Sequence, residues 1–277
     1  MRIATVNVNG IRAAARKGMG EWLAASAPDI LLLQEVRADE QIAVDLLPGY
    51  EAAIWPCRIK GRAGVGVAVR EGGPATLGEL RYGVAAPGTE EPDVDSGRWL
   101  EADLSLTGFD GLERLTVISA YLHSGQLGTE KMDQKYAHLE LVDARMAELL
   151  ASSESGGPQV VMAGDLNVVR SEQDIKNWKP NHNKTAGVMD EEIAHLEGWF
   201  AAGWIDVARR LAPREQGPYT WWSQRGKAFD NNAGWRLDYQ VTTPRLAERA
   251  SSFTVDRADS YASRWSDHAP LVIDYAF

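Results

Sequence analysis

The sequence predicts an α/β protein in which two β-sheets pack face to face and helices cover their outer sides. Apolar runs with the length and β-branched content of buried strands alternate with helical patterns in both halves of the chain. Polar side chains follow five of these runs, as they do where chemistry gathers at the edge of a sheet. No short repeat and no linker interrupts the 277 residues, so we expect one domain spanning 1–277.

The elements follow from apolar periodicity and from the residues that end each run. The predicted strands are residues 3–8, 30–33, 65–69, 99–106, 115–121 and 160–162. The predicted helices are residues 18–27, 129–150 and 190–202. Between them we expect surface loops at residues 78–97, 152–158 and 170–187.

Local residues support each predicted helix. Trp22 and Leu23 supply the apolar edge of the first helix, and Pro28 ends it. The third helix is capped by Asp190 and ended by Gly203. The second helix has core residues at helical spacing, namely Met132, Tyr136, Leu139, Val142, Met146 and Leu149.

The strand at residues 160–162 leads into an unusual pair of polar residues. Asp165 and Asn167 follow Gly164, where we expect the strand to end. Alone, the pair fits a helix cap or a turn, but an unpaired buried carboxylate would be costly. Four other strand ends carry polar side chains as well, which favours a functional site over a set of caps. These side chains are Asn7 and Asn9, Gln34 and Glu35, Asp238, and the group Ser266, Asp267 and His268.

Composition narrows the functional classes. The net charge of −10 argues against indiscriminate nucleic-acid binding, although local Lys and Arg contacts with phosphates remain compatible with it. No apolar run approaches the roughly 18 residues of a membrane span, and the first residues do not form a signal peptide. Cys57 is the single cysteine, which fits a reducing cytoplasm, and we expect a structural thiol.

Taken in order, these segments resemble the exonuclease III family of AP endonucleases, within the deoxyribonuclease I-like phosphoesterase superfamily. The matching motifs are TVNVNGIR, LLLQEVR, the strand ending at Tyr121, AGDLNV, GWRLDY and WSDHAPL, and they span nearly the whole chain. The resemblance implies a four-layer α/β/β/α sandwich of two packed mixed β-sheets flanked by helices, in agreement with the periodicity.

The resemblance also implies a magnesium site and a catalytic set. Glu35 resembles the principal Mg²⁺ ligand, with Asn7 beside it and Asp267 close by. Such oxygen ligands suit a hard ion, and Mn²⁺ is the expected substitute. Asn9 is either a turn residue or a metal-site residue, because some relatives carry an aspartate there. The implied catalytic set is Tyr121 at the scissile phosphate, Asp165 on the attacking water, Asn167 beside it, His268 as base or phosphate donor, and Asp238 fixing the His268 tautomer.

Charge repulsion supports this grouping independently of the resemblance. If Glu35, Asp165 and Asp267 converge, each pair at about 4 Å repels by ~4 kcal/mol at an effective dielectric near 20. A divalent cation would remove that repulsion and would polarise a phosphoryl oxygen. An Asp–His pair with a second carboxylate for water would then permit in-line hydrolysis without a covalent intermediate.

The tryptophans bear on which phosphoester is the substrate. Trp221, Trp235 and Leu237 resemble the residues that wall the pocket for an extruded baseless sugar, whereas strand alternation turns Trp222 toward the core. An apolar slot of this kind excludes a normal nucleotide by size, and extrusion costs least where pairing is absent. Two basic segments, one with Arg62 and one with Lys176, are either contacts to the DNA backbone or plain surface loops.

One segment departs from the family pattern. After Tyr121 the chain continues with Leu122, His123 and Ser124, where relatives usually have a proline and then Asn or Gln. We expect His123 or Ser124 to replace a phosphate or sugar contact, with activity retained.

The expected function is therefore that of a Mg²⁺-dependent phosphodiesterase of base-excision repair. It would incise double-stranded DNA 5′ to abasic sites and act on blocked 3′ ends, with 3′-phosphodiesterase and 3′→5′ exonuclease activity, as a cytoplasmic monomer without membrane binding. The alternative is a lipid or inositol-phosphate phosphoesterase, against which stands the lack of an amphipathic membrane-binding element. A third possibility is a catalytically silent DNA-binding protein, which the complete polar set disfavours because unpaired buried charges are costly.

Overall fold

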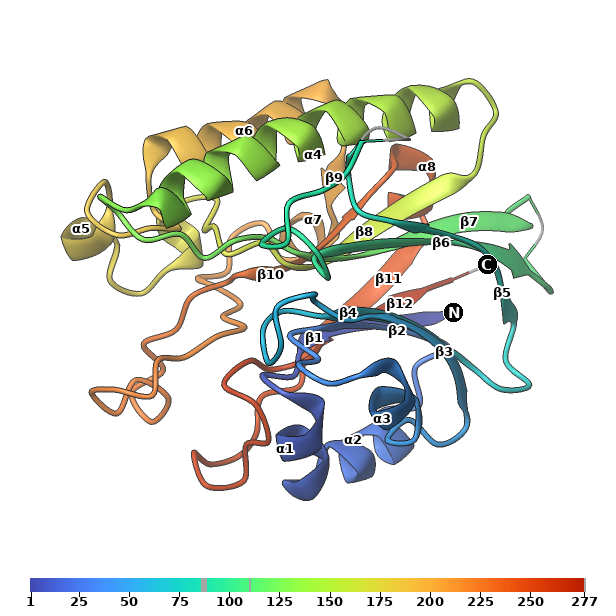
Figure 1. Cartoon of the computed structure of the whole chain (residues 1–277), viewed down its shortest axis with the longest axis horizontal. Helices are drawn as coiled ribbons and strands as arrows, with labels where there is room; N and C mark the ends of the chain where they lie inside the picture. The colour runs from blue at the N-terminus through green and yellow to red at the C-terminus, as the bar shows by residue number, and fades with distance from the viewer. Residues whose placement is uncertain (86–88, 110, 277) are drawn as a thin grey trace.

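Two six-stranded β-sheets pack face to face, and helices lie on the outer side of each (Figure 1). The computed structural model describes residues 1–85, 89–109 and 111–276. The prediction of two packed mixed sheets flanked by helices is confirmed. None of the helices in these ranges is long and apolar enough to cross a membrane.

Sheet A contains the first strands of the chain and the last ones. Its strand order is β11-β12-β1-β2-β4-β3. Its strands are β1 (Arg2–Asn7), β2 (Ile30–Gln34), β3 (Tyr50–Trp55), β4 (Val65–Arg70), β11 (Ala250–Val255) and β12 (Leu271–Tyr275). Strands β1 and β2 run parallel, and the other neighbours are antiparallel.

Sheet B is built from the middle of the chain in the order β5-β6-β7-β8-β10-β9. Its strands are β5 (Ala75–Tyr82), β6 (Trp99–Leu106), β7 (Arg114–Tyr121), β8 (Gln159–Asp165), β9 (Ile205–Asp206) and β10 (Asp238–Thr242). Here β7 and β8 are the parallel pair. Each sheet therefore has a single parallel pair of neighbouring strands near its centre.

The helices form the two outer layers (Figure 1). Those on sheet A are α1 (Ile11–Arg16), α2 (Met19–Ser26) and α3 (Glu40–Val44), and those on sheet B are α4 (Glu130–Glu154) and α6 (Asp190–Ala202). The short helices are η1 (Glu172–Asp174), α5 (Trp178–Asn181), α7 (Val207–Leu211) and α8 (Pro244–Ala247). Thr129 caps α4 by accepting a hydrogen bond from the Lys131 amide.

Strand alternation divides the apolar residues among three cores, one between the sheets and one under each helical layer. In β1, Ile3 belongs to the core between the sheets, whereas Ala4 and Val6 pack under the helices. In β8, Val161 faces the other sheet, and Met162 packs under α4 and α6. Along each of these two strands, inward-facing positions recur at every second residue and lead to one end of the sandwich.

Polar side chains also tie the two sheets together in the core between them. Gln34 Nε2 donates to Ser119 Oγ at 3.0 Å, from β2 to β7. Gln240 Nε2 donates to the Ile3 carbonyl at 2.9 Å, from β10 to β1. Because these groups are buried, their hydrogen bonds disfavour any sliding of one sheet over the other.

The structure corrects several predicted boundaries. The predicted loop at residues 78–97 contains part of strand β5, although 86–88 lie outside the described residues. Gly164 does not end its strand, since β8 continues to Asp165, and α4 extends into the loop predicted at residues 152–158. Met189, not Asp190, holds the N-cap position of α6, and Asp190 is its first residue.

Candidate active site

The strand ends bring the predicted polar residues to one end of the sandwich. Asn7 ends β1, Tyr121 ends β7 and Asp165 ends β8, and all three lie on the strand faces that meet between the sheets. Strand β10 runs antiparallel to β8, so its first residue, Asp238, pairs with Asp165. Parallel strands deliver their carboxyl ends to one edge, and antiparallel neighbours deliver their amino ends there.

Gly164 explains how β8 comes so close to β7. A Cβ atom built at Gly164 would lie 1.8 Å from the carbonyl oxygen of Ala120, the residue that it pairs with. No other residue fits there without moving the strands apart. The glycine therefore sets the next pair in register, in which Tyr121 lies opposite Asp165.

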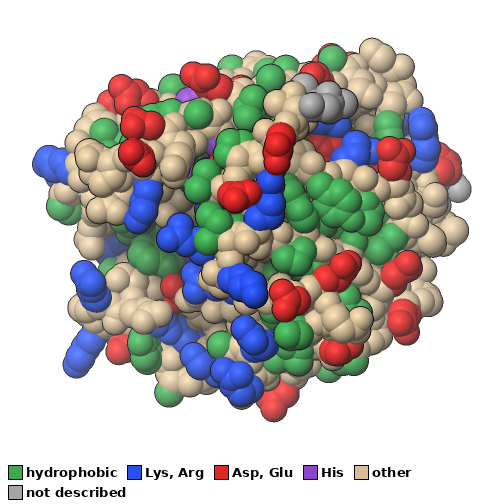
Figure 2. Space-filling model, viewed as in Figure 1, with side chains coloured by type: hydrophobic (Ala, Val, Ile, Leu, Met, Phe, Trp, Pro, Cys, Tyr) green, Lys and Arg blue, Asp and Glu red, His purple; other side chains and the backbone are tan. Residues whose placement is uncertain are grey.

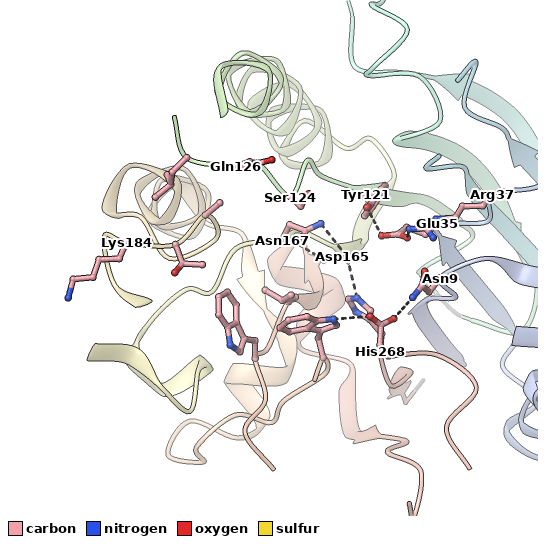
Figure 3. A pocket seen from close by; sticks show the side chains of 18 residues that line it. Asn9, Glu35, Arg37, Tyr121, Ser124, Gln126, Asp165, Asn167, Lys184 and His268 are labelled. Atoms are coloured by element: carbon pink, nitrogen blue, oxygen red, sulfur yellow. Dashed lines mark hydrogen bonds and ion pairs between the residues drawn. The ribbon is translucent and has the colours of Figure 1, made fainter. Parts of the chain in front are cut away.

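A cavity of about 700 Å³ opens over these strand ends (Figure 3). Carboxylates, amides and a histidine form its floor, and tryptophans form one side. The lining residues are Asn9, Glu35, Arg37, Tyr121, Ser124, Gly125, Gln126, Leu127, Asp165, Asn167, Lys184, Thr185, Ala186, Trp221, Trp235, Leu237, Asp267 and His268.

His268 lies in the floor between two carboxylates. Its Nδ1 is 2.8 Å from Asp238 Oδ2, and its Nε2 is 3.6 Å from Asp165 Oδ2. Burial alone would lower the pKa of His268, but Asp238 and Asp165 outweigh it and raise that pKa to about 10. Burial, followed by Asp238 and Glu35, raises the pKa of Asp165 to about 7 against the opposing effect of His268.

Two amides orient the Asp165 carboxylate. Asn7 Nδ2 donates to Asp165 Oδ2 at 2.8 Å, and Asn167 Nδ2 donates to the same oxygen at 3.3 Å. The Asn167 backbone N–H donates to Oδ1 at 2.9 Å. Both oxygens of this buried carboxylate therefore have donors, which fixes its plane.

Glu35 lies across the cavity floor from Asp165. The Tyr121 hydroxyl donates to Glu35 Oε1 at 2.5 Å, Asn7 Nδ2 donates to the same oxygen at 3.1 Å, and Arg37 forms an ion pair with Oε2. Burial and the neighbouring Glu35 carboxylate raise the pKa of Tyr121 well above its usual value. Tyr121 therefore stays a phenol that can donate a hydrogen bond.

The floor of the cavity contains several residues with left-handed backbone conformations. The φ angles are 46° at Asn9, 49° at Glu35, 50° at Arg37 and 51° at Asn167. Asparagine tolerates this region, but glutamate and arginine adopt it only when the surrounding structure enforces it. Such strained residues cluster at binding and catalytic sites, which supports a functional role for this end of the sandwich.

Asp267 closes the floor opposite Asp165. Asn9 Nδ2 donates to Asp267 Oδ1 at 2.8 Å, and Trp221 Nε1 donates to Oδ2 at 3.2 Å. Burial opposes ionisation of Asp267, but His268 and these donors outweigh it and lower the pKa. Asn9 thus contacts a predicted metal ligand as a hydrogen-bond donor.

The donor set fits a divalent cation. Glu35, Asp165, Asp238 and Asp267 belong to one contact network, in which the described cationic partners are Arg37 and His268. Carboxylates therefore outnumber the positive charges, and Glu35 Oε2, whose described partner is Arg37, keeps a lone pair for a ligand. Carboxylate and amide oxygens are the ligands that Mg²⁺ prefers. The site can hold a metal ion among Glu35, Asn7 and Asp267.

A second group of metal-ligating atoms fits a proton better than Mg²⁺. Ligand atoms of Asp165, Asp238 and His268 lie within 4.8 Å of one another. However, His268 Nδ1 is already hydrogen-bonded to Asp238, and imidazole is a ligand for softer metals than magnesium. The geometry of this trio therefore suits the exchange of a proton better than the binding of Mg²⁺.

The aromatic side of the cavity is a narrow wall beside Asp267 and His268. The Trp221 and Trp235 rings meet edge to face, with centroids 5.6 Å apart and an interplanar angle of 79°. Leu237 lies beside them, and all three line the cavity. Trp222 instead packs in a separate core against Phe229, as alternation predicts.

Comparison with known proteins identifies the family. The family model described as the endonuclease/exonuclease/phosphatase family matches residues 4–268. The chain belongs to this family. An exodeoxyribonuclease of Bacillus subtilis is 31% identical over 273 residues, 98% of each chain. A DNA-(apurinic or apyrimidinic site) endonuclease of Dictyostelium discoideum is 28% identical over 274 residues, 98% of this chain and 69% of that one.

Solved structures agree with the sequence relatives. The structure of an AP endonuclease from Archaeoglobus fulgidus matches with a TM-score of 0.81 at 26% identity, and 100% of both chains is covered. The resemblance to the exonuclease III family that the six motifs indicate is confirmed. The protein is a hydrolytic nuclease of the endonuclease/exonuclease/phosphatase family.

Three predicted contact residues of this nuclease lie away from the cavity. Arg62 and Lys176 are exposed and do not line it. His123 is buried, with Nε2 2.6 Å from Asp95 Oδ1, so of the two expected substitutes it is not the one that faces the cavity. Ser124, the other expected substitute, does line the cavity.

The sequence does not single out Arg37 as a cavity cation or Leu127 as an exposed apolar residue at the edge, and it places Lys184 only within the same basic segment as Lys176. The signal for Arg37 was present, because it follows Glu35 by two residues at a strand end. On the face shown in Figure 2, Lys and Arg side chains gather at the left and lower left, on the side of the loops beyond the strand ends. The acidic net charge is thus compatible with a locally basic surface.

Proposed function

We propose that this nuclease is a Mg²⁺-dependent DNA repair phosphodiesterase that incises duplex DNA on the 5′ side of abasic sites. It also removes blocking groups and nucleotides from 3′ ends. The observation that carries the proposal is the position of the Trp221–Trp235 wall, which shares one cavity with the Glu35, Asp165 and His268 cluster. Relatives named as exodeoxyribonuclease and as AP endonuclease support both halves of the activity.

The tryptophan wall favours a sugar without its base. A flat apolar wall next to a hydrolytic cluster gives deoxyribose a surface to pack on while the phosphodiester reaches the floor. A damaged nucleotide that lacks a base partner leaves the stack at the lowest cost, which adds selectivity for abasic sites. The expected products are a 3′-hydroxyl and a 5′-phosphate that carries the baseless sugar.

Asp165 is proposed to accept a proton from the attacking water or to orient it. Asn7 and Asn167 hold its two oxygens, so its remaining lone pairs face the cavity in one orientation. The water oxygen forms the new bond to phosphorus, and the bond from phosphorus to the 3′ oxygen breaks. No covalent intermediate is needed, since the nucleophile is water.

His268 and Tyr121 are proposed to act on the phosphate. His268 Nδ1 is occupied by Asp238, so only Nε2 is free to face the substrate. The Tyr121 phenol can turn from Glu35 to a phosphate oxygen. Glu35, Asn7 and Asp267 would hold the Mg²⁺ ion, and when bound the ion would supply charge neutralisation at the phosphoryl oxygen and the leaving 3′ oxygen.

The test is one duplex oligonucleotide with a single reduced abasic site, incubated with Mg²⁺, with Mn²⁺ and with a chelator. We expect a single incision 5′ to the site with either metal and none with the chelator. A polymerase should extend the product, because its 3′ end is a hydroxyl. The same duplex with a normal nucleotide at that position is the control.

Uncut abasic duplex under all metal conditions would refute the proposed specificity. If the control duplex were nevertheless degraded from its 3′ ends, the protein would be an exonuclease without activity at abasic sites. Release of phosphate from inositol phosphates, with DNA left intact, would instead favour the lipid or inositol-phosphate alternative.

A further inference from the structure

Behind the floor of the cavity lies a buried ion pair to which the mechanism above assigns no role. Lys135 of α4 and Glu192 of α6 are 2.5 Å apart between Nζ and Oε1, and both side chains are fully buried. Taking both charges out of water is costly, and an apolar pair of similar volume often gives equal or better stability. Stability alone is therefore a weak reason for these two charges.

Both partners of the pair are bound to the backbone of the cavity loops. Lys135 Nζ donates to the Asn167 carbonyl oxygen at 2.9 Å. Glu192 Oε2 accepts hydrogen bonds from the backbone N–H groups of Gly187 at 2.6 Å and Met189 at 3.0 Å. The pair thus links the turn after β8 to the loop that contributes Lys184, Thr185 and Ala186 to the cavity wall.

The two loops meet at the same carbonyl group. A Cβ atom at Gly187 would lie 2.7 Å from the Asn167 carbonyl oxygen, so only glycine allows this approach. The Val169 N–H also donates to the Gly187 carbonyl at 2.9 Å. The Asn167 carbonyl is consequently held by Lys135 on one side and packed against Gly187 on the other.

Holding this carbonyl matters because Asn167 has a left-handed backbone, with φ at 51°. In this conformation its N–H and its Nδ2 both reach Asp165, and Nδ2 also donates to the Leu122 carbonyl at 3.0 Å. If the backbone at Asn167 left the left-handed region, its side chain and N–H would no longer point together at the Asp165 carboxylate.

We propose that Lys135, paired with Glu192 in the interior, is a positioning residue that sets the orientation of Asp165 through the Asn167 carbonyl. It acts on the chemical step and touches neither substrate nor metal. The proposal deepens the proposed function and rests on the role given there to Asp165.

Four variants separate positioning from simple support of the fold. Lys135→Met leaves Glu192 buried without its cation, so we expect a lower urea midpoint together with lower kcat. Lys135→Met/Glu192→Gln has no unpaired charge and keeps an acceptor for the Gly187 N–H. Lys135→Arg keeps both the charge and a donor. Arg70→Met/Asp29→Asn is the matched control, since it removes an ion pair with a buried carboxylate that also accepts a backbone N–H, at the opposite end of sheet A.

The expected result is a split between stability and kcat. Lys135→Met/Glu192→Gln should recover most of the urea midpoint lost in Lys135→Met, yet its kcat should remain at least tenfold below wild type with KM within threefold. Lys135→Arg should restore most of kcat, and the control should keep wild-type kcat. A double variant that recovers kcat together with stability would show that the pair only supports the fold and would overturn the proposal.

Two substrates distinguish a failure of this positioning proposal from a failure of the proposed function. Each variant is assayed for abasic incision and for 3′-end degradation of an undamaged duplex, because a positioning defect lowers both. A wild type that degrades ends without abasic incision would refute the abasic specificity and leave the positioning test intact. Crystal structures of wild type and the double variant add a readout independent of activity, and an unchanged Asn167 turn in the variant would also overturn the proposal.

Discussion

The two parallel strand pairs, one in each sheet, differ in how exposed their polar residues are. In sheet A, β1 ends at Asn7 and Glu35 directly follows β2, and Glu35 is partly exposed, has a left-handed backbone and faces the cation Arg37. In sheet B, β7 and β8 end at Tyr121 and Asp165, and the Asp165 side chain is 2% exposed. The same local topology therefore presents its polar residues in two different environments.

This difference in exposure suggests that the two sheets contribute residues with different roles to the site. A partly exposed carboxylate can exchange partners with an incoming ion, whereas a buried one has a strongly shifted pKa and a fixed orientation. On this view sheet A and the segments beside its strands supply His268 as well as the ligands for the cation, and sheet B supplies the two carboxylates, Asp165 and Asp238, that handle the proton with His268. Variants in the two halves should then fail in different ways.

The largest effect is expected from Asp165→Asn in the buried half. The change keeps the shape of the side chain but removes the carboxylate proposed to act on the attacking water, so single-turnover cleavage should fall by about 10³-fold or more. Fluorescence anisotropy should find abasic-DNA binding largely unchanged, and extra Mg²⁺ should not restore cleavage. Turnover close to wild type would remove the role assigned to Asp165.

Glu35→Gln should give the next largest loss, and this loss should respond to metal. Replacing a charged ligand with a neutral one should raise the Mg²⁺ concentration needed for half-maximal activity by about 10–100-fold. A metal titration of the cleavage rate checks this directly. If saturating Mg²⁺ or Mn²⁺ recovered no activity, the proposed difference between metal-binding and proton-handling residues would be contradicted.

Trp235→Ala tests the aromatic wall, which adjoins both halves. Loss of the packing surface should reduce abasic incision by about tenfold, with a smaller effect on 3′-end degradation and none on metal dependence. Trp222→Ala is the matched control, because this buried tryptophan should cost roughly 3–5 kcal/mol of stability instead. Equal losses of incision and metal response in Trp235→Ala would indicate a core residue.

A buried histidine under the helices of sheet B should make stability depend on pH. His138 of α4 is buried, and burial followed by His123 lowers its pKa from 6.5 to about 3. Between these values only the unfolded chain takes up the proton, so this histidine's share of stability is present above pH 6.5 and decreases as the pH falls. At pH 5 the loss should be about 2 kcal/mol. Urea unfolding of wild type and His138→Gln at pH 7 and pH 5 should show a smaller decrease in the variant.

The smallest effects should come from the exposed lysine and arginine outside the cavity. If Lys176 and Arg62 contact DNA phosphates, alanine at either position should lower the slope of log K against log salt by about one. Binding measured at several salt concentrations checks this. Slopes identical to wild type would identify both as plain surface residues.

The sequence predicts the inner parts of the molecule better than its edges. Asn7 and Asp165 are predicted because Asn7 lies near the end of one predicted strand and Asp165 comes shortly after another, and both lie on the inward face in the structure. Strand β5 was missed because it is an edge strand with a mixed burial pattern, so it lacks a strict apolar alternation. Lys135 was not identified, since a charged residue in a helix normally faces water.

Loop placement explains the remaining differences. Which loops fold over the strand ends depends on how the two sheets stack, and a single sequence does not encode this in its periodicity. Lys184 therefore reads like Lys176 in sequence, although only Lys184 lines the cavity. His123 was assigned toward the substrate, and its partner Asp95 comes from a distant segment that no local pattern reveals.

Strand β12 pairs with β1 in the interior of sheet A, although nearly the whole chain separates them in sequence. Ser266, just before β12, donates to the Asn7 carbonyl at 2.6 Å, and His268 follows two residues later. During synthesis on the ribosome, a nascent chain that still lacks the segment from Ser266 through β12 therefore lacks both His268 and one of the two neighbouring strands of β1. Hydrolytic capacity should therefore arise only when translation of this segment is complete.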